Sequence, residues 1–373
     1  MTEQPPFAPD TLADVVALTR AMCDIESVSG NERALADAIE ATLAAHAPHL
    51  AVTRDGDAIV ARTQLGREQR VIIAGHIDTV PVNDNLPTVL GDDPDDPTNP
   101  DGAHLIGRGT VDMKGGCAVA LALACRLPEP AVDVSFVWYD HEEVDASLNG
   151  LGRLARTRPE LLQADFAVLG EPSNGAVEGG CNGTLRVDIT TRGRRAHSAR
   201  AWMGVNAIHA AAPILERLAA YQPATVTVDG LDYREGLNAV GISGGVAGNV
   251  IPDQCTVTVN YRFAPSRSLA DAEAHVRELF AGLDVDIAVT DAASGARPGL
   301  DAPLAQRFMA AVGGAPAPKY GWTDVARFSE LGIPAVNYGP GNPSLAHADD
   351  ERVPVAQIRD VERGLTAWLS ASI

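Results

Sequence analysis

The sequence has no long apolar segment, no paired cysteines and no excess of basic residues, and each absence excludes a class of protein. Its longest apolar run, 117–125, is much shorter than the roughly 18 residues of a membrane-spanning helix. The first ten residues, MTEQPPFAPD, contain no basic residue and no apolar stretch, so we expect no secretory signal. The five cysteines form no CxxC pair and are odd in number, which argues against a disulfide framework and favours a reducing cytoplasm.

Basic residues number 29 against 49 acidic ones, which gives a formal net charge of -20. A charge of this sign opposes binding to nucleic acid or to an anionic membrane, so we expect neither as a partner. An anionic small-molecule substrate would have to be gathered by local arginines, because the overall field repels it. Solubility alone is the ordinary explanation of such acidity.

The chain of 373 residues is long for one hydrophobic core and suits two domains. Its first half contains apolar runs typical of buried strands, at 70–74, 131–139 and 166–169, and a run rich in Ala and Leu typical of a buried helix, at 114–127. Strands that alternate with helices predict an α/β domain with a mostly parallel sheet. In such sheets ligands bind outside the carboxyl ends of the strands.

The pattern changes after residue 171, where 184–192 alternate apolar and polar side chains as a half-exposed strand does. The segments that follow are a helix, two strands, a helix and a strand, at 205–221, 239–246, 255–263, 269–281 and 285–290. The order β-α-β-β-α-β predicts a ferredoxin-like α+β domain. We therefore expect a discontinuous first domain, residues 1–180 and 294–373, interrupted by a second domain at 181–293.

Five residues spread along the chain look like the ligands of one metal centre: His76, Asp112, Glu143, Glu171 and His347. Two histidines and three carboxylates can hold two divalent ions, with one carboxylate left to bridge them. Glu142 stands beside a ligand, where a general base for hydrolysis would be placed. Asp78 lies two residues after His76, on the same face of a strand-like segment, and can accept the second ring N–H of that histidine.

Each of these motifs has an ordinary explanation when it stands alone. A His-x-Asp pair is commonly a polar surface pair, the glycine-rich turn around Asp112 could simply lead into a helix, and a loop histidine is commonly just exposed. The adjacent carboxylates of Glu142 and Glu143 need solvent or a cation, and a cation is the better answer after a buried strand. Because the motifs occur together in one chain, they predict a two-metal hydrolase.

Five motifs occur in the order GHIDTVP (75–81), GRGTVDMKGG (107–116), HEE (141–143), GEP (170–172) and HADDE (347–351). In this order they resemble the M20 family of dinuclear zinc amidohydrolases and exopeptidases, and IESVSGNE (25–32) resembles the N-terminal signature of that family. The resemblance covers nearly the whole chain. It implies a catalytic α/β domain of the zinc exopeptidase type, interrupted by a ferredoxin-like lid domain through which a homodimer forms.

The resemblance also implies roles for single residues. Two zinc ions, for which cobalt is a possible substitute, would be held as follows: one by His76 and Glu171, the other by Glu143 and His347, and both by the bridging Asp112. Glu142 would be the catalytic base, supported by Asp78. The peptide bond between Asp112 and Met113 would be cis.

Further roles implied by the resemblance lie outside the metal ligands. His197, reached from the lid of the partner subunit, would stabilise the tetrahedral oxyanion. Arg262 and Asn249 are the candidates for binding a substrate carboxylate, since arginine offers a two-pronged donor fork. Thr323 matches a further position of the family pattern and is a candidate substrate contact. Arg262 could equally be an ordinary exposed residue of a strand.

Two stretches, 170–184 and 247–268, are most similar to actinobacterial members of the family that hydrolyse N-succinyl-LL-2,6-diaminopimelate to succinate and LL-2,6-diaminopimelate. Cys181 and Asn182 depart from many enterobacterial members, which have paired arginines there, so the substrate contacts of those arginines cannot be transferred. Another M20 activity, such as acetylornithine deacetylation or dipeptide cleavage, would use the same ligands. A non-catalytic binding protein on the same fold is opposed by the retention of Glu142 and all five ligands.

Overall fold

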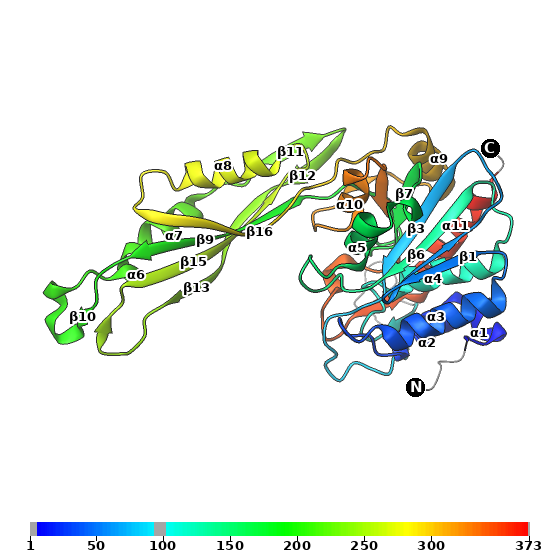
Figure 1. Cartoon of the computed structure of the whole chain (residues 1–373), viewed down its shortest axis with the longest axis horizontal. Coiled ribbons are helices and arrows are strands. Elements are labelled where there is room, and N and C mark those ends of the chain that lie inside the picture. Colours follow the sequence, from blue (N-terminus) through cyan, green and yellow to red (C-terminus); the bar gives the residue numbers. More distant parts are fainter. Residues whose placement is uncertain (1–5, 93–101, 372–373) are drawn as a thin grey trace. The chain divides into compact units, whose positions relative to one another are not determined.

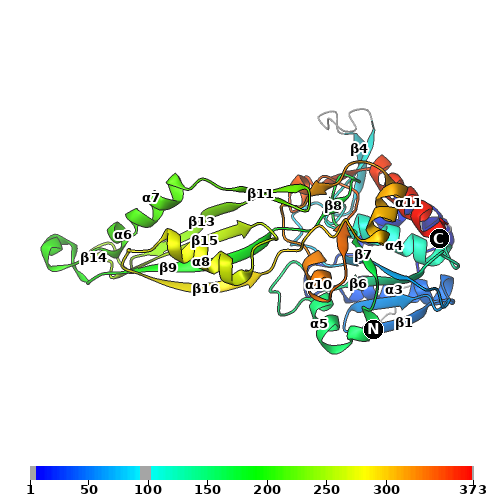
Figure 2. The same cartoon turned by 90° about the horizontal axis from the view of Figure 1, so that it is seen from above.

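The computed structural model describes residues 6–92 and 102–371, and the chain divides into two compact units (Figures 1 and 2). Unit 1 comprises the described residues of Met1–Gly179, Gly299–Ala317 and Thr323–Ile373, and unit 2 comprises Gly180–Pro298 and Pro318–Trp322. The boundaries expected from the sequence differ from these units at residue 180 and at 294–298, which belong to unit 2, and so does the segment 318–322. This segment is tied to unit 2, because Asn182 N–H donates to Lys319 O (3.3 Å) and Trp322 Nε1–H donates to Ser294 O (3.0 Å).

An eight-stranded sheet forms the centre of unit 1, in the order β1-β2-β6-β3-β7-β18-β8-β17. Its four middle strands run parallel: β6 (Asp133–Tyr139), β3 (Arg70–His76), β7 (Phe166–Leu169) and β18 (Ala335–Asn337). The flanking strands are β1 (Ala51–Asp55), β2 (Ala58–Arg62), β8 (Glu178–Gly179) and β17 (Ala317–Pro318). Every residue of β6 and β7 is buried, as in parallel sheets that are covered on both faces. The mostly parallel α/β fold predicted from the sequence is confirmed.

Helix α4 (Lys114–Arg126) is the buried helix of unit 1, and its residues 114–124 are all buried. It contacts β3 and β6, and on its other sides α2 (Val15–Asp24), α3 (Arg33–His46) and α11 (Val355–Ser370). The shorter helices of unit 1 are α1 (Pro9–Ala13), α5 (Gly150–Thr157), α9 (Pro303–Val312), α10 (Val325–Glu330), η1 (Pro159–Leu161) and η3 (Pro343–Leu345). Within the described part of the chain, no helix is both long enough and apolar enough to cross a membrane.

A small antiparallel sheet in unit 1 brings two distant loops together. It consists of β4 (Val89–Asp92), β5 (Ala103–Ile106) and β19 (Arg352–Pro354), with β5 in the middle. The loop that contains Asp112 leaves from the end of β5, and the loop that contains His347 leads into β19. Because these two strands pair with each other, the two loops begin side by side.

Unit 2 has the ferredoxin-like order that the sequence predicts. Its antiparallel sheet, in the order β13-β15-β9-β16, consists of β13 (Gly236–Gly244), β15 (Gln254–Phe263), β9 (Gly183–Arg192) and β16 (Val285–Ala293). Three helices pack on one face of this sheet: α6 (Ala207–Ala210), α7 (Ala212–Ala220) and α8 (Leu269–Leu279) (Figure 1). Apolar side chains between the helices and the sheet, such as Val257, Val259 and Ile214, form the core of this unit.

Several short elements are added to this order in unit 2. They are the hairpin β11 (Thr225–Val228) and β12 (Leu231–Arg234), the pair β10 (Ala196–His197) and β14 (Val250–Ile251), and η2 (Ser198–Met203). At the base of unit 2, the incoming and outgoing chain are hydrogen-bonded to each other. Cys181 N–H donates to Ala296 O (3.0 Å), and Ala296 N–H donates to Cys181 O (3.1 Å).

Three glycines allow a close approach where α4 begins. A Cβ atom added to Gly116 would lie 2.3 Å from the carbonyl oxygen of Gly170, and one added to Gly339 would lie 2.1 Å from the same atom. The obstructing atoms belong to the backbone, so they cannot turn aside as a side chain could. The glycines therefore allow α4 and the loop at Gly339 to pack against the end of β7, directly before Glu171.

The substitution Gly116→Ala is expected to lower the free energy of unfolding by about 1–3 kcal/mol, as overpacking of a rigid site does. The clash should outweigh the gain of about 1 kcal/mol that alanine brings to a helix interior. Urea denaturation followed by circular dichroism measures the difference. Gly321→Ala is the matched control, because nothing lies within 4 Å of the added methyl group there. A Gly116→Ala variant as stable as the wild type would show that the contact with Gly170 is loose.

Candidate metal centre

The presumed ligands come from one edge of the parallel sheet and from two loops beside it. His76 is the last residue of β3, Glu171 follows β7 by two residues, and Glu143 follows β6. Because β3 pairs in parallel with both β6 and β7, the carboxyl ends of these strands meet at the same edge. Asp112 lies just before α4, and His347 lies in the loop that leads into β19.

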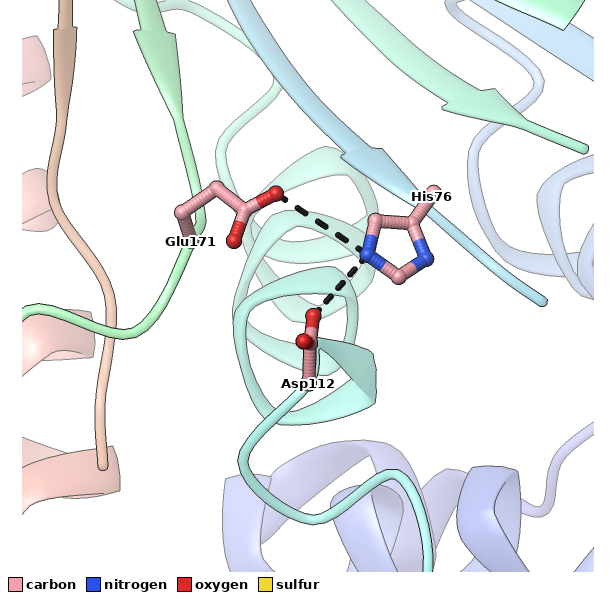
Figure 3. A group of neighbouring side chains, drawn as sticks. All are labelled: His76, Asp112 and Glu171. Atoms are coloured by element: carbon pink, nitrogen blue, oxygen red, sulfur yellow. Dashed lines mark hydrogen bonds and ion pairs between the residues drawn. The ribbon is translucent and has the colours of Figure 1, made fainter. Parts of the chain in front are cut away.

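The Asp112 carboxylate lies between the two histidines. Its Oδ1 atom is 3.0 Å from His76 Nε2, and its Oδ2 atom is 3.4 Å from His347 Nε2. Glu171 Oε1 lies 3.9 Å from His76 Nε2 (Figure 3), and Glu143 Oε1 lies 2.9 Å from His347 Nε2. Two groups that could each hold a metal ion, with ligand atoms within 4.8 Å of one another, therefore share Asp112. The peptide bond after Asp112 is cis, as the resemblance implies.

Glu142 belongs to a third such group, together with His76 and Glu143. Loss of hydration raises the pKa of the Glu142 carboxyl well above its usual value, and the nearby charges of Asp324 and Glu171 raise it further. The protonated form of the Glu142 carboxyl is thereby favoured. Glu142 thus has the proton affinity of a residue that accepts and returns a proton, while its position also allows it to bind a cation.

The two histidines offset the negative charge of their neighbours. Contacts with Asp112 and Glu143 raise the pKa of His347 to about 10. Burial lowers the pKa of His76, but hydrogen bonds to Asp112 and Asp78 outweigh it, and the net pKa is raised well above the usual value. Both imidazoles therefore hold protons that a divalent cation would displace, since a histidine ligand must be neutral.

Asp78 is buried and ties three segments of the site together. Its carboxylate accepts hydrogen bonds from Ser29 Oγ–H (2.6 Å) and from the backbone N–H groups of Glu142 and Glu143 (3.0 Å each). Burial raises the pKa of Asp78, but these bonds and the contact with His76 outweigh it and lower the pKa to about 2. Asp78 therefore remains an anion that holds the segment of the presumed base in place.

The contact between Asp78 and His76 differs in detail from the expected one. His76 Nδ1 lies 3.0 Å from the backbone carbonyl oxygen of Asp78 and 3.4 Å from its carboxylate. The carbonyl is the nearer acceptor, because the carboxylate is directed to the N–H groups of the loop after β6. Asp78 still fixes the ring of His76, through its main chain as well as its side chain.

Sequence reasoning missed two buried carboxylates that support the site. Glu351 accepts hydrogen bonds from the N–H groups of Val111 and Asp112, at 2.9 and 3.1 Å. Glu32 accepts one from His141 N–H, at 3.2 Å, directly before Glu142. Both acids stand at the ends of quoted motifs, IESVSGNE and HADDE, which was the available signal. Their partners are backbone groups, which leave no mark in the sequence.

The other predicted site residues lie elsewhere. Thr323 is buried in unit 1, where its hydroxyl donates to Asn337 Oδ1 (2.8 Å). His197 and Asn249 are neighbours in unit 2, since Ser198 N–H donates to Asn249 O (2.9 Å). Arg262 belongs to the same unit and lies near the end of β15.

Within unit 2, Arg262 is far from His197 and Asn249. Arg262 of β15 pairs with Thr184, near the start of β9. His197 in β10 comes shortly after Arg192, the last residue of β9 (Figure 1). These two ends of β9 are eight residues apart, or roughly 26 Å along an extended strand. Arg262 and Asn249 of one chain are therefore not brought together.

Comparisons with known proteins agree with one another. Residues 72–371 match the model of a family described as Peptidase family M20/M25/M40. A protein of Corynebacterium glutamicum named succinyl-diaminopimelate desuccinylase is 47% identical over 369 residues, which cover 97% of this chain and 97% of that protein. A Mycobacterium tuberculosis protein that carries the same name provisionally is 54% identical over 349 residues, 94% of this chain and 96% of that protein.

Among solved structures, aminopeptidase PepT from Bacillus cereus has a TM-score of 0.74 at 17% identity, covering 96% of this chain and 98% of that one. At this identity the likeness concerns the fold. The family, in contrast, is shown by two findings. The family model matches most of the chain, and two relatives are similar over nearly their full length. The chain belongs to peptidase family M20/M25/M40.

Proposed function

We propose that the chain is a two-zinc amidohydrolase that cleaves N-succinyl-LL-2,6-diaminopimelate into succinate and LL-2,6-diaminopimelate. The observation that carries this proposal is the position of the Asp112 carboxylate between His76 and His347, each of which has a further carboxylate beside it. The substrate follows from the names of the relatives that are 47% and 54% identical over nearly the whole chain. We propose the cytoplasm as the place of the reaction, because the sequence has five cysteines, an odd number, and no CxxC pair among them.

The residues present fit zinc. Zinc is commonly bound by imidazole nitrogens and carboxylate oxygens, and cobalt accepts the same ligand types. The division of ligands that we propose is His76 and Glu171 for one ion, Glu143 and His347 for the other, and Asp112 for both. Two zinc ions bound there would polarise the amide carbonyl and lower the pKa of the attacking water.

Glu142 then acts as the base. Its carboxylate takes a proton from the water as the water attacks the amide carbon, and it gives a proton to the leaving amine nitrogen. The raised pKa supports the first step, because a group that binds its proton more tightly is a stronger base. Asp78 holds the base in position through the N–H groups of Glu142 and Glu143.

The substrate contacts that we propose draw on two chains. Arg262 and Asn249 are donors for the carboxylates of the substrate, and His197 is the donor for the oxyanion. Within one chain His197 and Asn249 lie at one end of the sheet of unit 2 and Arg262 lies at the other. A ligand that touches both groups therefore needs a second subunit.

An exposed apolar edge of unit 2 supports a homodimer. Strand β13 is an edge strand, with a row of backbone groups open to pairing. Val240, Ile242 and Val246 on or just after this strand are 60%, 57% and 66% exposed, and Trp202 of the same unit is 79% exposed. Exposed apolar side chains along an edge strand with open backbone groups support an interface at this strand. Pairing through β13 is the arrangement that we propose.

A panel of substrates tests the proposed function. Zinc-loaded protein is expected to hydrolyse N-succinyl-LL-2,6-diaminopimelate with a kcat/KM about a hundredfold or more above that for N-acetylornithine or a dipeptide, since recognition of polar groups discriminates strongly. The release of free amine is the readout. A preference for the acetyl compound or for the dipeptide would identify a different M20 activity. No turnover of any substrate, with two zinc ions bound, would identify a binding protein.

The substitution Glu142→Gln separates catalysis from metal binding. The amide has the shape of the carboxylate but cannot accept the proton, so kcat is expected to fall by a factor of roughly a hundred or more. Zinc content, measured by atomic emission, should stay at the wild-type value. Zinc loss in proportion to activity would instead make Glu142 a ligand, a role that its position beside His76 and Glu143 allows.

Mixing two inactive variants tests whether the site is completed by a second chain. In a dimer of His197→Ala with Glu142→Gln, one site contains both Glu142 and a partner His197. Random exchange makes about half of the dimers mixed, so roughly a quarter of the wild-type activity should return. Each variant alone is the control, and subunit exchange is followed by mass spectrometry. If activity stays absent after exchange, His197 works within its own chain or has no role.

A further inference from the structure

We infer that Glu351, paired with Arg108, is a positioning residue that fixes the separation of Asp112 and His347 and thereby shapes the binding site of one of the two metal ions. The inference rests on the proposed two-metal function and assigns a role to a residue that touches neither substrate nor metal. It is carried by the contacts of one buried carboxylate.

Both oxygen atoms of Glu351 are engaged, and its side chain is fully buried. Oε1 accepts the N–H groups of Val111 (2.9 Å) and Asp112 (3.1 Å), and Oε2 accepts Arg108 Nη1–H (2.8 Å). The carboxylate thus binds the main chain of the presumed bridging ligand itself. A carboxylate with three donors makes a strong and directional contact in a buried site.

The main chain of Glu351 sets the register of the same two loops. Strands β5 and β19 pair with Ile106 opposite Arg352, and Gly107 N–H donates to Glu351 O (2.8 Å) at the next step. The ladder thus continues to Glu351, whose side chain then reaches forward to Asp112. Glu351 therefore fixes the position of the loop that contains Asp112 relative to the loop that contains His347.

Arg108 completes the connection on the side of His347. It is 3% exposed, and while Nη1 binds Glu351, Nη2–H donates to His347 O at 3.4 Å. A second link runs parallel to it, because Arg108 N–H donates to Asn85 O (3.1 Å) and Asn85 Nδ2–H donates to Asp349 O (3.2 Å). The guanidinium fork thus spans the two loops, which the single ammonium group of a lysine could not do.

The two metal ions depend on this connection to different degrees. The group Asp112, Glu143 and His347 takes two of its three ligands from the loops that Glu351 joins, whereas the group His76, Asp112 and Glu171 takes only one. His76 and Glu171 stand at the ends of sheet strands, which hold them independently. The side chain of His347 is 52% exposed, so little else packs around it. Loss of Glu351 should therefore weaken the ion at His347 most.

The ordinary alternative is that Glu351 and Arg108 only stabilise the fold. The chain contains a matched pair for this comparison, Glu235 with Arg267 in unit 2. Glu235 is also buried, and it accepts Ala264 N–H (3.0 Å) and Arg267 Nε–H (2.6 Å). The substitution to glutamine removes the same charge from the same kind of network there, without touching a loop that contains a presumed ligand.

The experiment is a titration of the apo-protein with cobalt(II), followed by the visible absorption of the bound ion and by calorimetry. The wild type should bind two ions, and His347→Ala identifies the binding event that depends on His347. Glu351→Gln is expected to weaken that event about tenfold to a hundredfold, the usual effect of losing a group that orients a ligand, and the other event less than about threefold. Glu235→Gln should leave both events unchanged.

Thermal unfolding of each variant checks that it is folded, and Arg108→Lys provides a second variant, which keeps the positive charge and is expected to weaken the same binding event. Equal cobalt affinities in Glu351→Gln and the wild type would overturn the inference, as would an equal loss in Glu351→Gln and Glu235→Gln. A wild type that binds fewer than two cobalt ions would instead overturn the proposed function. The selective loss of the event at His347 in Glu351→Gln supports the inference.

Discussion

Repulsion between carboxylates is the constraint on which the site depends. Five acidic side chains gather at one edge of the sheet of unit 1: Asp78, Asp112, Glu142, Glu143 and Glu171. Three of them are offset by different means, since Asp78 accepts N–H and O–H groups, Asp112 lies between two imidazoles, and Glu142 has a raised proton affinity. Such a cluster is unfavourable without a cation. The same repulsion between carboxylates therefore destabilises this edge without metal and favours the binding of metal ions.

The fold meets this constraint with rigid backbone rather than with additional basic side chains. The parallel strands bring His76, Glu143 and Glu171 to one edge, and the glycines at the start of α4 let the helix and a neighbouring loop approach that edge closely. The two remaining ligands are on loops, and there the chain uses paired strands and a buried ion pair. The ligands at strand ends are thus positioned by the sheet itself. The two ligands on loops are positioned by additional hydrogen bonds and by the buried ion pair.

Sequence patterns predicted those parts of the molecule that repeat or alternate. The parallel sheet, the buried helix α4 and the ferredoxin-like order followed from apolar runs and from period-two alternation, because each pattern reports burial directly. The five presumed ligands stood out because acids and histidines followed buried strands or glycine turns. Glu351 did not stand out, since its partners are backbone N–H groups about 240 residues away in the chain. The separation of Arg262 from Asn249 depends on strand register, which the sequence alone does not reveal.

The hydrogen bonds between Cys181 and Ala296 have a consequence for how such a chain can change over time. They join the two ends of the inserted unit 2, so the entropy of closing this long excursion is offset within the insertion itself. Apart from 318–322, which also belongs to unit 2, the inserted segment Gly180–Pro298 thus leaves and re-enters the rest of the chain at one place, as a short surface loop does. An insertion of this kind can be exchanged or enlarged while the sheet around His76 keeps its geometry. Residues that bind substrate can therefore change without a change in the metal ligands.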